Sequence, residues 1–238
     1  MTQPDDLRVK IFADGADLAS MVELAAQPYI KGLTTNPTLM KQAGITDYQL
    51  FAKEVLNQIT SKPISFEVFA DDHDEMLRQG LLIASWAENV YVKVPVTTTD
   101  GTSCVPLIRE LSSHGVKLNV TALMTVDQVR EVLEALAPAV PAIISVFAGR
   151  IADTGRDPMP IMREALDVMK ARPEVELIWA SPRELLNVFQ ADEVGCHIIT
   201  ATPDVLKKLA LIGKDLTQYS VETVQMFHRD ATAAGFQL

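Results

Sequence analysis

The stretch "VYVKVPV", residues 90–96, reads as a β-strand that is buried on both faces, except for the lysine at its centre. A near-continuous run of β-branched and aromatic residues is typical of a strand in a parallel sheet covered on both sides. An ammonium group placed there costs several kcal/mol unless it is paired or gives up its proton. Lys93 is therefore either at an exposed strand end or present for its chemistry.

Seven further runs of this kind recur along the chain, each followed by a segment that repeats apolar residues at spacings of three and four, as amphipathic helices do. The eight predicted strands are residues 9–14, 32–37, 64–70, 90–96, 116–122, 142–149, 175–181 and 196–202. The clearest helical segments are residues 19–29, 47–59, 74–87, 126–136 and 160–171. Eight alternating β and α segments in 238 residues match a (β/α)8 TIM barrel of the α/β class.

Nothing in the sequence divides the chain into separate domains. It has no Gly/Ser-rich or Pro-rich linker and no G-x-G-x-x-G loop of the kind that an open, nucleotide-binding sheet carries. We therefore predict one barrel domain over residues 1–238, with residues 215–238 as a C-terminal helical tail. The tail has an apolar stripe that includes Met226, Phe227 and Phe236. Packing of this stripe on its own barrel competes with docking on a neighbouring subunit.

The composition limits the classes of partner and the location. A net charge of −10 argues against general nucleic-acid binding and against docking on anionic membranes. The start of the chain lacks the basic and apolar regions of an export signal, and no apolar run approaches a membrane span. Cys104 and Cys196 lie far apart and form neither a disulfide framework nor a zinc motif. We expect a cytoplasmic protein.

Polar side chains lie late in most of the predicted strands, where barrels of this type place their active sites. Each is weak evidence alone, because Ser, Thr and Asn are common structural residues. In a barrel, however, they would all project toward one axial cavity, which an ordinary core would fill with Val, Ile and Leu. The set is Asp14, Thr34, Thr35, Asn36, Glu67, Lys93, Asn119, Thr121, Ser145 and Ser181.

Lys93 is the residue of this set whose chemistry is most specific. Strand alternation turns it toward the cavity while Val92 and Val94 face away. Desolvation there favours the neutral amine, which adds to carbonyls and forms a Schiff base, an electron sink for breaking or making a carbon–carbon bond. Glu67 and Asp14 would be the acid/base partners. The alternative is a purely structural ion pair between Lys93 and Glu67.

Two segments late in the chain indicate that one end of the cavity binds phosphate. "SVFAGRIAD" supplies Arg150, and "WASPREL" supplies Ser181 and Arg183 at a loop that we expect to open the next helix. Pro182 suits a first helical turn with Ser181 as its cap. Arginines and a helix N-terminus together form an anion site, and barrels often bind phosphate at the late loops. They favour a phosphorylated sugar, although isolated surface arginines are the alternative.

Several of these segments, in this order, resemble motifs of the transaldolase family. "GLTTNPTLM" resembles its G-[VI]-T-[ST]-N-P-[ST] segment, "YVKVPVT" its Schiff-base lysine strand and "LNVTALMT" its Asn-x-Thr strand. "ISVFAGRIAD" is similar to Ser-Pro-Phe-Val-Gly-Arg-Ile-x-Asp, and "ASPREL" to Ala-Ser-Phe-Arg-Asn. The resemblance runs from the first strand to the eighth.

The resemblance implies a role for each matching residue. Lys93 would form the Schiff base, Glu67 and Asp14 would transfer protons and place a water, and Thr121 would support that water. The substrate-binding candidates are Asn36, Thr34, Asn119, Ser145, Phe147, Arg150, Ser181 and Arg183, the last of which would hold phosphate with Arg150 and Ser181. The implied reaction moves a dihydroxyacetone unit from a ketose phosphate, such as sedoheptulose 7-phosphate or fructose 6-phosphate, to an aldose phosphate, without a metal or organic cofactor.

The short chain is closer to the compact branch of the family, which also holds fructose-6-phosphate aldolases. Those aldolases carry Gln in place of the strand-three carboxylate and Tyr after strand six, whereas this chain has Glu67 and Phe147, the transaldolase choice at both. In this branch the C-terminal helix often packs on a neighbour in pentameric or decameric rings. The resemblance therefore implies a homo-oligomer that acts on small sugar phosphates, with no nucleic-acid or membrane partner.

Three positions depart from the family pattern: Gly15 replaces the usual Thr, Val146 the usual Pro, and Pro182 the usual Phe. They leave an altered sugar substrate open. Two other readings also stay open, a dihydroxyacetone-using aldolase and a non-catalytic sugar-phosphate-binding barrel in which Lys93 pairs with a ligand anion.

Overall fold

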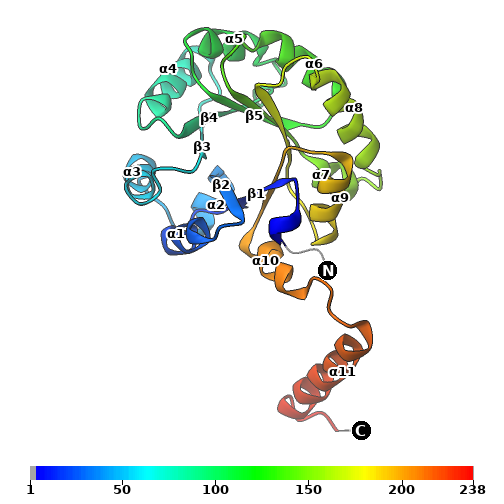
Figure 1. The fold of residues 1–238 in the computed structure, drawn as a ribbon. Coiled ribbons are helices and arrows are strands. Elements are labelled where there is room, and N and C mark those ends of the chain that lie inside the picture. The colour runs from blue at the N-terminus through cyan, green and yellow to red at the C-terminus, as the bar shows by residue number, and fades with distance from the viewer. Residues whose placement is uncertain (1–3, 238) are drawn as a thin grey trace.

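The computed structural model describes residues 4–237, and in this range eight parallel strands close into a barrel (Figure 1). Each strand pairs with the next in chain order and the last pairs with the first, so the predicted TIM barrel is confirmed. The strands are β1 Lys10–Asp14, β2 Ile30–Thr34, β3 Ile64–Glu67, β4 Val90–Pro95, β5 Leu118–Leu123, β6 Ala142–Val146, β7 Val175–Trp179 and β8 Ile198–Ala201.

Helices surround the barrel and alternate with its strands (Figure 1). The side chains of Asp17, Asp47, Asp72 and Thr125 each accept a backbone N–H in the first turn of a helix, which satisfies donors that the helix itself leaves free. The helices are α1 Leu18–Ala26, α2 Pro37–Gln42, α3 Tyr48–Gln58, α4 His73–Ala84, α5 Val105–Ser113, α6 Val126–Ala135, α7 Ala148–Asp153, α8 Met159–Met169, α9 Leu186–Val194, α10 Pro203–Leu206 and α11 Leu216–Ala233.

Apolar side chains fill the barrel interior on the N-terminal side of the strand ends that carry the polar residues. Phe12, Ile143, Ile178 and Ile198 are buried together inside the ring of strands. The Phe12 ring lies so close to β2 that a Cβ atom at Gly32 would be 2.4 Å from it, well inside van der Waals contact. Only a glycine fits beside this ring, and the packed interior forms an apolar floor beneath the C-terminal ends of the strands.

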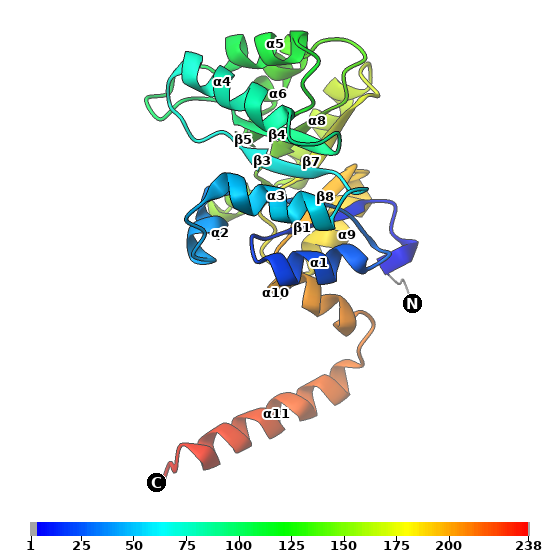
Figure 2. The same ribbon diagram turned by 90° about the vertical axis from the view of Figure 1, so that its left-hand side faces the viewer.

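Helix α11 extends away from the barrel beyond α10 (Figure 2). None of its residues is buried, and its apolar side chains include Leu216 at 81% and Phe227 at 61% exposure. Phe236, which follows the helix, is also exposed. The tail is helical as predicted, and it does not cover its apolar stripe on its own barrel. Among residues 4–237, no helix has the length and apolar character needed to cross a membrane.

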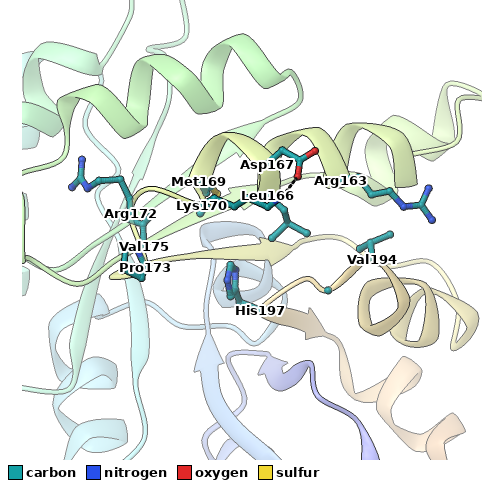
Figure 3. A pocket seen from close by; sticks show the side chains of 11 residues that line it. Arg163, Leu166, Asp167, Met169, Lys170, Arg172, Pro173, Val175, Val194 and His197 are labelled. Carbon is teal, nitrogen blue, oxygen red and sulfur yellow. Dashed lines mark ion pairs between the residues drawn. The ribbon is translucent and has the colours of Figure 1, made fainter.

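A cavity of about 540 Å³ lies at the N-terminal ends of β7 and β8, against α8 (Figure 3). Its cations are engaged locally: Lys170 pairs with Asp167 at 2.7 Å, and Arg172 with Glu174 at 2.5 Å. The Nδ1 atom of His197 accepts the backbone N–H of Leu177 at 2.9 Å. This cavity is at the end of the barrel opposite to the predicted site residues.

Candidate active site

The C-terminal ends of the strands open into a polar cavity of about 560 Å³. Its wall contains every residue that the sequence analysis assigned to catalysis or substrate binding: Asp14, Thr34, Asn36, Glu67, Lys93, Asn119, Thr121, Ser145, Phe147, Arg150, Ser181 and Arg183. The apolar floor closes the barrel below them. Side chains that are up to 169 residues apart in the chain, Asp14 and Arg183, therefore share one chamber.

Lys93 lies on β4 at the centre of this group and is only 7% exposed. Its Nζ atom is 3.3 Å from Oε2 of Glu67, which is directly opposite it in the β3–β4 register. The same Nζ donates to the backbone carbonyl of Thr35 at 3.1 Å. Val92 and Val94 are fully buried on the other face of β4, so strand alternation orients Lys93 as predicted.

Asp14 ends β1 and accepts hydrogen bonds from two neighbours. The hydroxyl of Thr34 donates to Oδ1 at 2.8 Å, and the amide nitrogen of Asn36 is 3.5 Å from Oδ2. Because the single hydroxyl proton of Thr34 goes to Asp14, Thr200 must donate to Thr34, at 2.5 Å. Burial raises the pKa of Asp14, while the charge of Lys93 and the two hydrogen bonds oppose that rise.

Glu67 is the second carboxyl group of the cavity. Burial raises its pKa, the charge and hydrogen bond of Lys93 lower it, and the nearby charge of Asp14 raises it. Asp14 and Glu67 both lie near the Lys93 amine, and the pKa of each is above its ordinary value. These two carboxyl groups therefore retain a proton at higher pH than exposed carboxyl groups do. Such groups suit proton transfer near neutral pH.

A chain of hydrogen bonds orders the part of the wall formed by β3, β5 and β6. Asn119 donates through Nδ2 to the Ser65 hydroxyl at 2.9 Å, and Ser145 donates to Oδ1 of Asn119 at 2.7 Å. The Thr121 hydroxyl is buried and has no hydrogen-bond partner among residues 4–237. A buried hydroxyl left unsatisfied is destabilising, so this one is free to bind a polar group that enters the cavity.

The arginine end of the cavity is formed by α7 and the segment after β7. Predicted strand 142–149 ends at Val146, so Arg150 lies on the short helix α7, with its guanidinium 5.8 Å from the centre of the Phe147 ring. Arg183 donates to Asp153 through two nitrogen atoms, with Nε 3.0 Å from Oδ1. This fork holds the guanidinium at the cavity wall beside Arg150.

The prediction that Ser181 caps a helix is wrong. Ser181 has φ of 61°, in the left-handed region, and α9 begins only at Leu186. The intervening loop is held by the Asn187 side chain, which accepts the N–H of Arg183 at 2.7 Å and the N–H that follows. A Cβ atom at Gly149 would be 1.5 Å from the Ser181 carbonyl oxygen, so the Ser181 backbone is fixed by contact with α7 rather than by a helix.

Three residues of the site escaped the sequence analysis. Thr200 lies late in the predicted strand 196–202, so the rule that selected the other strand-end residues applies to it as well. Ser65 lies within predicted strand 64–70 and bonds Asn119. Tyr48 belongs to helix α3, and its hydroxyl contacts the Glu67 backbone, a link between distant elements that no local pattern indicates.

Known protein families and proteins resemble this chain in sequence. Residues 11–238 match the sequence model of the family described as Transaldolase/Fructose-6-phosphate aldolase. The chain belongs to this family. A "Probable transaldolase" of Dehalococcoides mccartyi is 35% identical over 202 residues, which is 84% of this chain and 90% of that one. A "Probable transaldolase" of Herpetosiphon aurantiacus is 34% identical over 216 residues, 90% of this chain and 92% of that one.

Solved structures share the fold at low sequence identity. A dihydrodipicolinate synthase family protein from Coccidioides immitis superposes with a TM-score of 0.61 at 14% identity, over 97% of this chain and 80% of that one. Dihydrodipicolinate synthase from Rhodopseudomonas palustris gives a TM-score of 0.61 at 15% identity, over 93% and 80% of the two chains. At such identities these likenesses bear on the barrel alone. Membership of the transaldolase/fructose-6-phosphate aldolase family makes this chain a transaldolase-type enzyme.

Proposed function

We propose that this family member is a transaldolase, which transfers a dihydroxyacetone unit from a ketose phosphate to an aldose phosphate through a Schiff base on Lys93. The observation that carries the proposal is a buried lysine whose Nζ is 3.3 Å from a carboxylate at the wall of a polar cavity. A purely structural ion pair would not need a cavity at the amine, nor the free hydroxyl of Thr121. The amine instead lies where a sugar carbonyl can reach it.

In the first half-reaction, the Lys93 amine adds to the ketose C2 carbonyl and gives a carbinolamine. Loss of water, with protons handled by Glu67 and a water held by Thr121, gives an iminium ion. Asp14 then takes the proton of the C4 hydroxyl as the C3–C4 bond breaks. The bonding electron pair passes to the iminium nitrogen as an enamine, and an aldose phosphate leaves.

The second half-reaction reverses these steps with another aldose. The enamine adds to the acceptor aldehyde, Asp14 returns its proton to the new hydroxyl, and water hydrolyses the iminium to release the product ketose. The hydrogen-bonded Asn119 and Ser145 support binding of the dihydroxyacetone hydroxyls. Arg150 and Arg183 at the far wall support binding of the phosphate.

The test of the proposed function is chemical trapping. Incubation of the protein with fructose 6-phosphate and sodium borohydride is expected to reduce the iminium ion and leave a stable mass adduct on Lys93. Peptide mass spectrometry locates the adduct. A protein that gives no adduct with any ketose phosphate does not form the Schiff base, and the proposal fails.

The same preparation separates transferase from aldolase activity. With Glu67 and Phe147 in place, we expect transfer to an aldose phosphate acceptor to be faster than release of free dihydroxyacetone. Coupled assays of both products measure the ratio. Rapid release without an acceptor would reverse the assignment in favour of a dihydroxyacetone aldolase.

We also propose that the enzyme is a cytoplasmic homo-oligomer in which α11 covers its apolar stripe against another copy. The support is the stripe itself, since Leu216, Val224 and Phe227 are exposed on a helix that leaves its own barrel. Removal of residues 215–238 is expected to yield monomers, as measured by sedimentation velocity. An oligomer of unchanged size after this truncation would contradict the proposal.

A further inference from the structure

The hydrogen-bond ladder between β2 and β3 stops just short of the candidate active site. The N–H of Leu33 bonds the Pro63 carbonyl at 2.8 Å, and the N–H of Thr35 bonds the Ser65 carbonyl at 3.2 Å, so the ladder advances two residues at a time. The next N–H in this series would come from residue 37. That residue is proline, which has no N–H, and the ladder ends there.

Without an N–H at residue 37, the Glu67 carbonyl has no donor on β2, and the Glu67 N–H also has its partner elsewhere. A side chain from α3 is the partner of both groups: the Tyr48 hydroxyl accepts the N–H of Glu67 at 2.7 Å and donates to the Glu67 carbonyl at 2.8 Å. One hydroxyl thereby satisfies both backbone groups of a catalytic candidate. Burial raises the pKa of Tyr48, which keeps the hydroxyl protonated and able to donate.

The bonds between Tyr48 and the Glu67 backbone also affect the hydrogen bonding of Lys93. In a continued ladder, the Thr35 carbonyl would accept the N–H of Glu67. Here it accepts Nζ of Lys93 at 3.1 Å instead. The Tyr48 hydroxyl therefore keeps Glu67 from occupying the acceptor that holds the amine.

We propose that Tyr48 is a positioning residue for the reaction. It holds the Glu67 backbone apart from β2, so that the Thr35 carbonyl is left for Lys93 and the Glu67 carboxylate stays 3.3 Å from the amine. This inference rests on the proposed function, because it assumes that Lys93 and Glu67 act in catalysis. The inference assigns a role to Tyr48, a residue of helix α3 that does not itself line the cavity.

The variant Tyr48→Phe removes the hydroxyl and keeps the ring, which packs edge-on against Phe66 at a centroid distance of 6.4 Å. Without the hydroxyl, the Glu67 N–H is expected to turn to the Thr35 carbonyl and displace Lys93. We expect kcat to fall by about tenfold to a hundredfold while KM changes by less than about threefold. The acid limb of the pH profile of kcat should move to higher pH, because a Glu67 carboxyl further from Lys93 loses the charge that lowers its pKa.

Trp86→Phe is the matched control. Trp86 packs on Tyr48 at a ring-centroid distance of 5.9 Å in the same aromatic cluster, and its indole nitrogen has no hydrogen-bond partner in the described part of the chain. The change therefore trims the cluster without touching Glu67. It should lower the melting temperature while leaving kcat and its pH profile intact. Equal kcat losses in both variants would make the role of Tyr48 merely structural.

The trapping experiment separates this inference from the proposed function. The wild-type protein and Tyr48→Phe are both expected to form the borohydride adduct on Lys93, the variant more slowly. Wild-type kcat and pH profile in Tyr48→Phe would overturn the inference and leave the proposed function standing. An adduct absent from the wild-type protein would remove the proposed function first, and the inference with it.

Discussion

Replacement of Lys93 by methionine is expected to reduce turnover by about a thousandfold or more, because the proposed Schiff base needs an amine in the cavity and Lys93 supplies it there. Methionine has a similar length and suits a buried strand, so the barrel should be retained. Breaking a buried ion pair is destabilising when it strands a charge. Glu67 has a raised pKa already, and without Lys93 it can take up a proton instead. The measurements are kcat, circular dichroism and the borohydride adduct.

Lys117→Met provides the control for loss of a strand lysine. Lys117 lies just before β5, at the opposite end of the barrel, and its Nζ bonds the Glu88 carbonyl. This variant should keep full activity and full adduct formation. If Lys93→Met retained turnover, the Schiff base would not be part of the reaction. If neither the wild-type protein nor Lys93→Met turned over a ketose phosphate and both bound it equally well, the non-catalytic barrel would replace the transaldolase.

Gly149→Ala is expected to disrupt the arginine end of the cavity. The added Cβ would lie 1.5 Å from the carbonyl oxygen of Ser181 and 2.6 Å from its carbonyl carbon, so one of the two backbones must move. We expect an unfolding free energy lower by about 2–4 kcal/mol, as for other large backbone clashes. The displaced loop carries Arg183. Loss of one charged hydrogen bond to phosphate should raise KM for a phosphorylated sugar by at least about tenfold.

Gly15→Ala is the matched control for stability. No heavy atom lies within 4 Å of a Cβ built there, and its φ is not in the left-handed region, so the melting temperature should be unchanged or slightly raised. Thermal unfolding and substrate titration of both variants make the comparison. A Gly149→Ala protein with wild-type melting temperature and KM would show that α7 and the Ser181 loop can separate without consequence.

The strand-borne part of the site was predictable from the sequence because strand alternation leaves a residue only two directions. Lys93 had to face either the helices or the axis, and its valine neighbours decided between them. Parallel strands in a barrel then bring their C-terminal ends together, which places Asn119 and Ser145 in the same cavity wall as Glu67 without any further information.

The loop-borne part was not predictable, because its conformation depends on contacts between distant segments. Pro182 and Arg183 look like a helix start, yet the Ser181 backbone is held in the left-handed region against Gly149, 32 residues earlier. Tyr48 is similar. Its role depends on where the β2–β3 ladder stops, which follows from the register of two strands rather than from the sequence around the tyrosine.

The apolar floor of the barrel predicts the kinetic order of the proposed transfer. Phe12 packs against Gly32 and is buried together with Ile143, Ile178 and Ile198, so apolar side chains lie between the cavity and the N-terminal ends of the strands. In the proposed reaction, donor and acceptor sugars would therefore both enter from the C-terminal ends of the strands. Under the proposed mechanism, the aldose released from the donor would have to leave before the acceptor could reach the enamine. We therefore expect ping-pong kinetics, with the dihydroxyacetone unit bound to Lys93 between the two half-reactions.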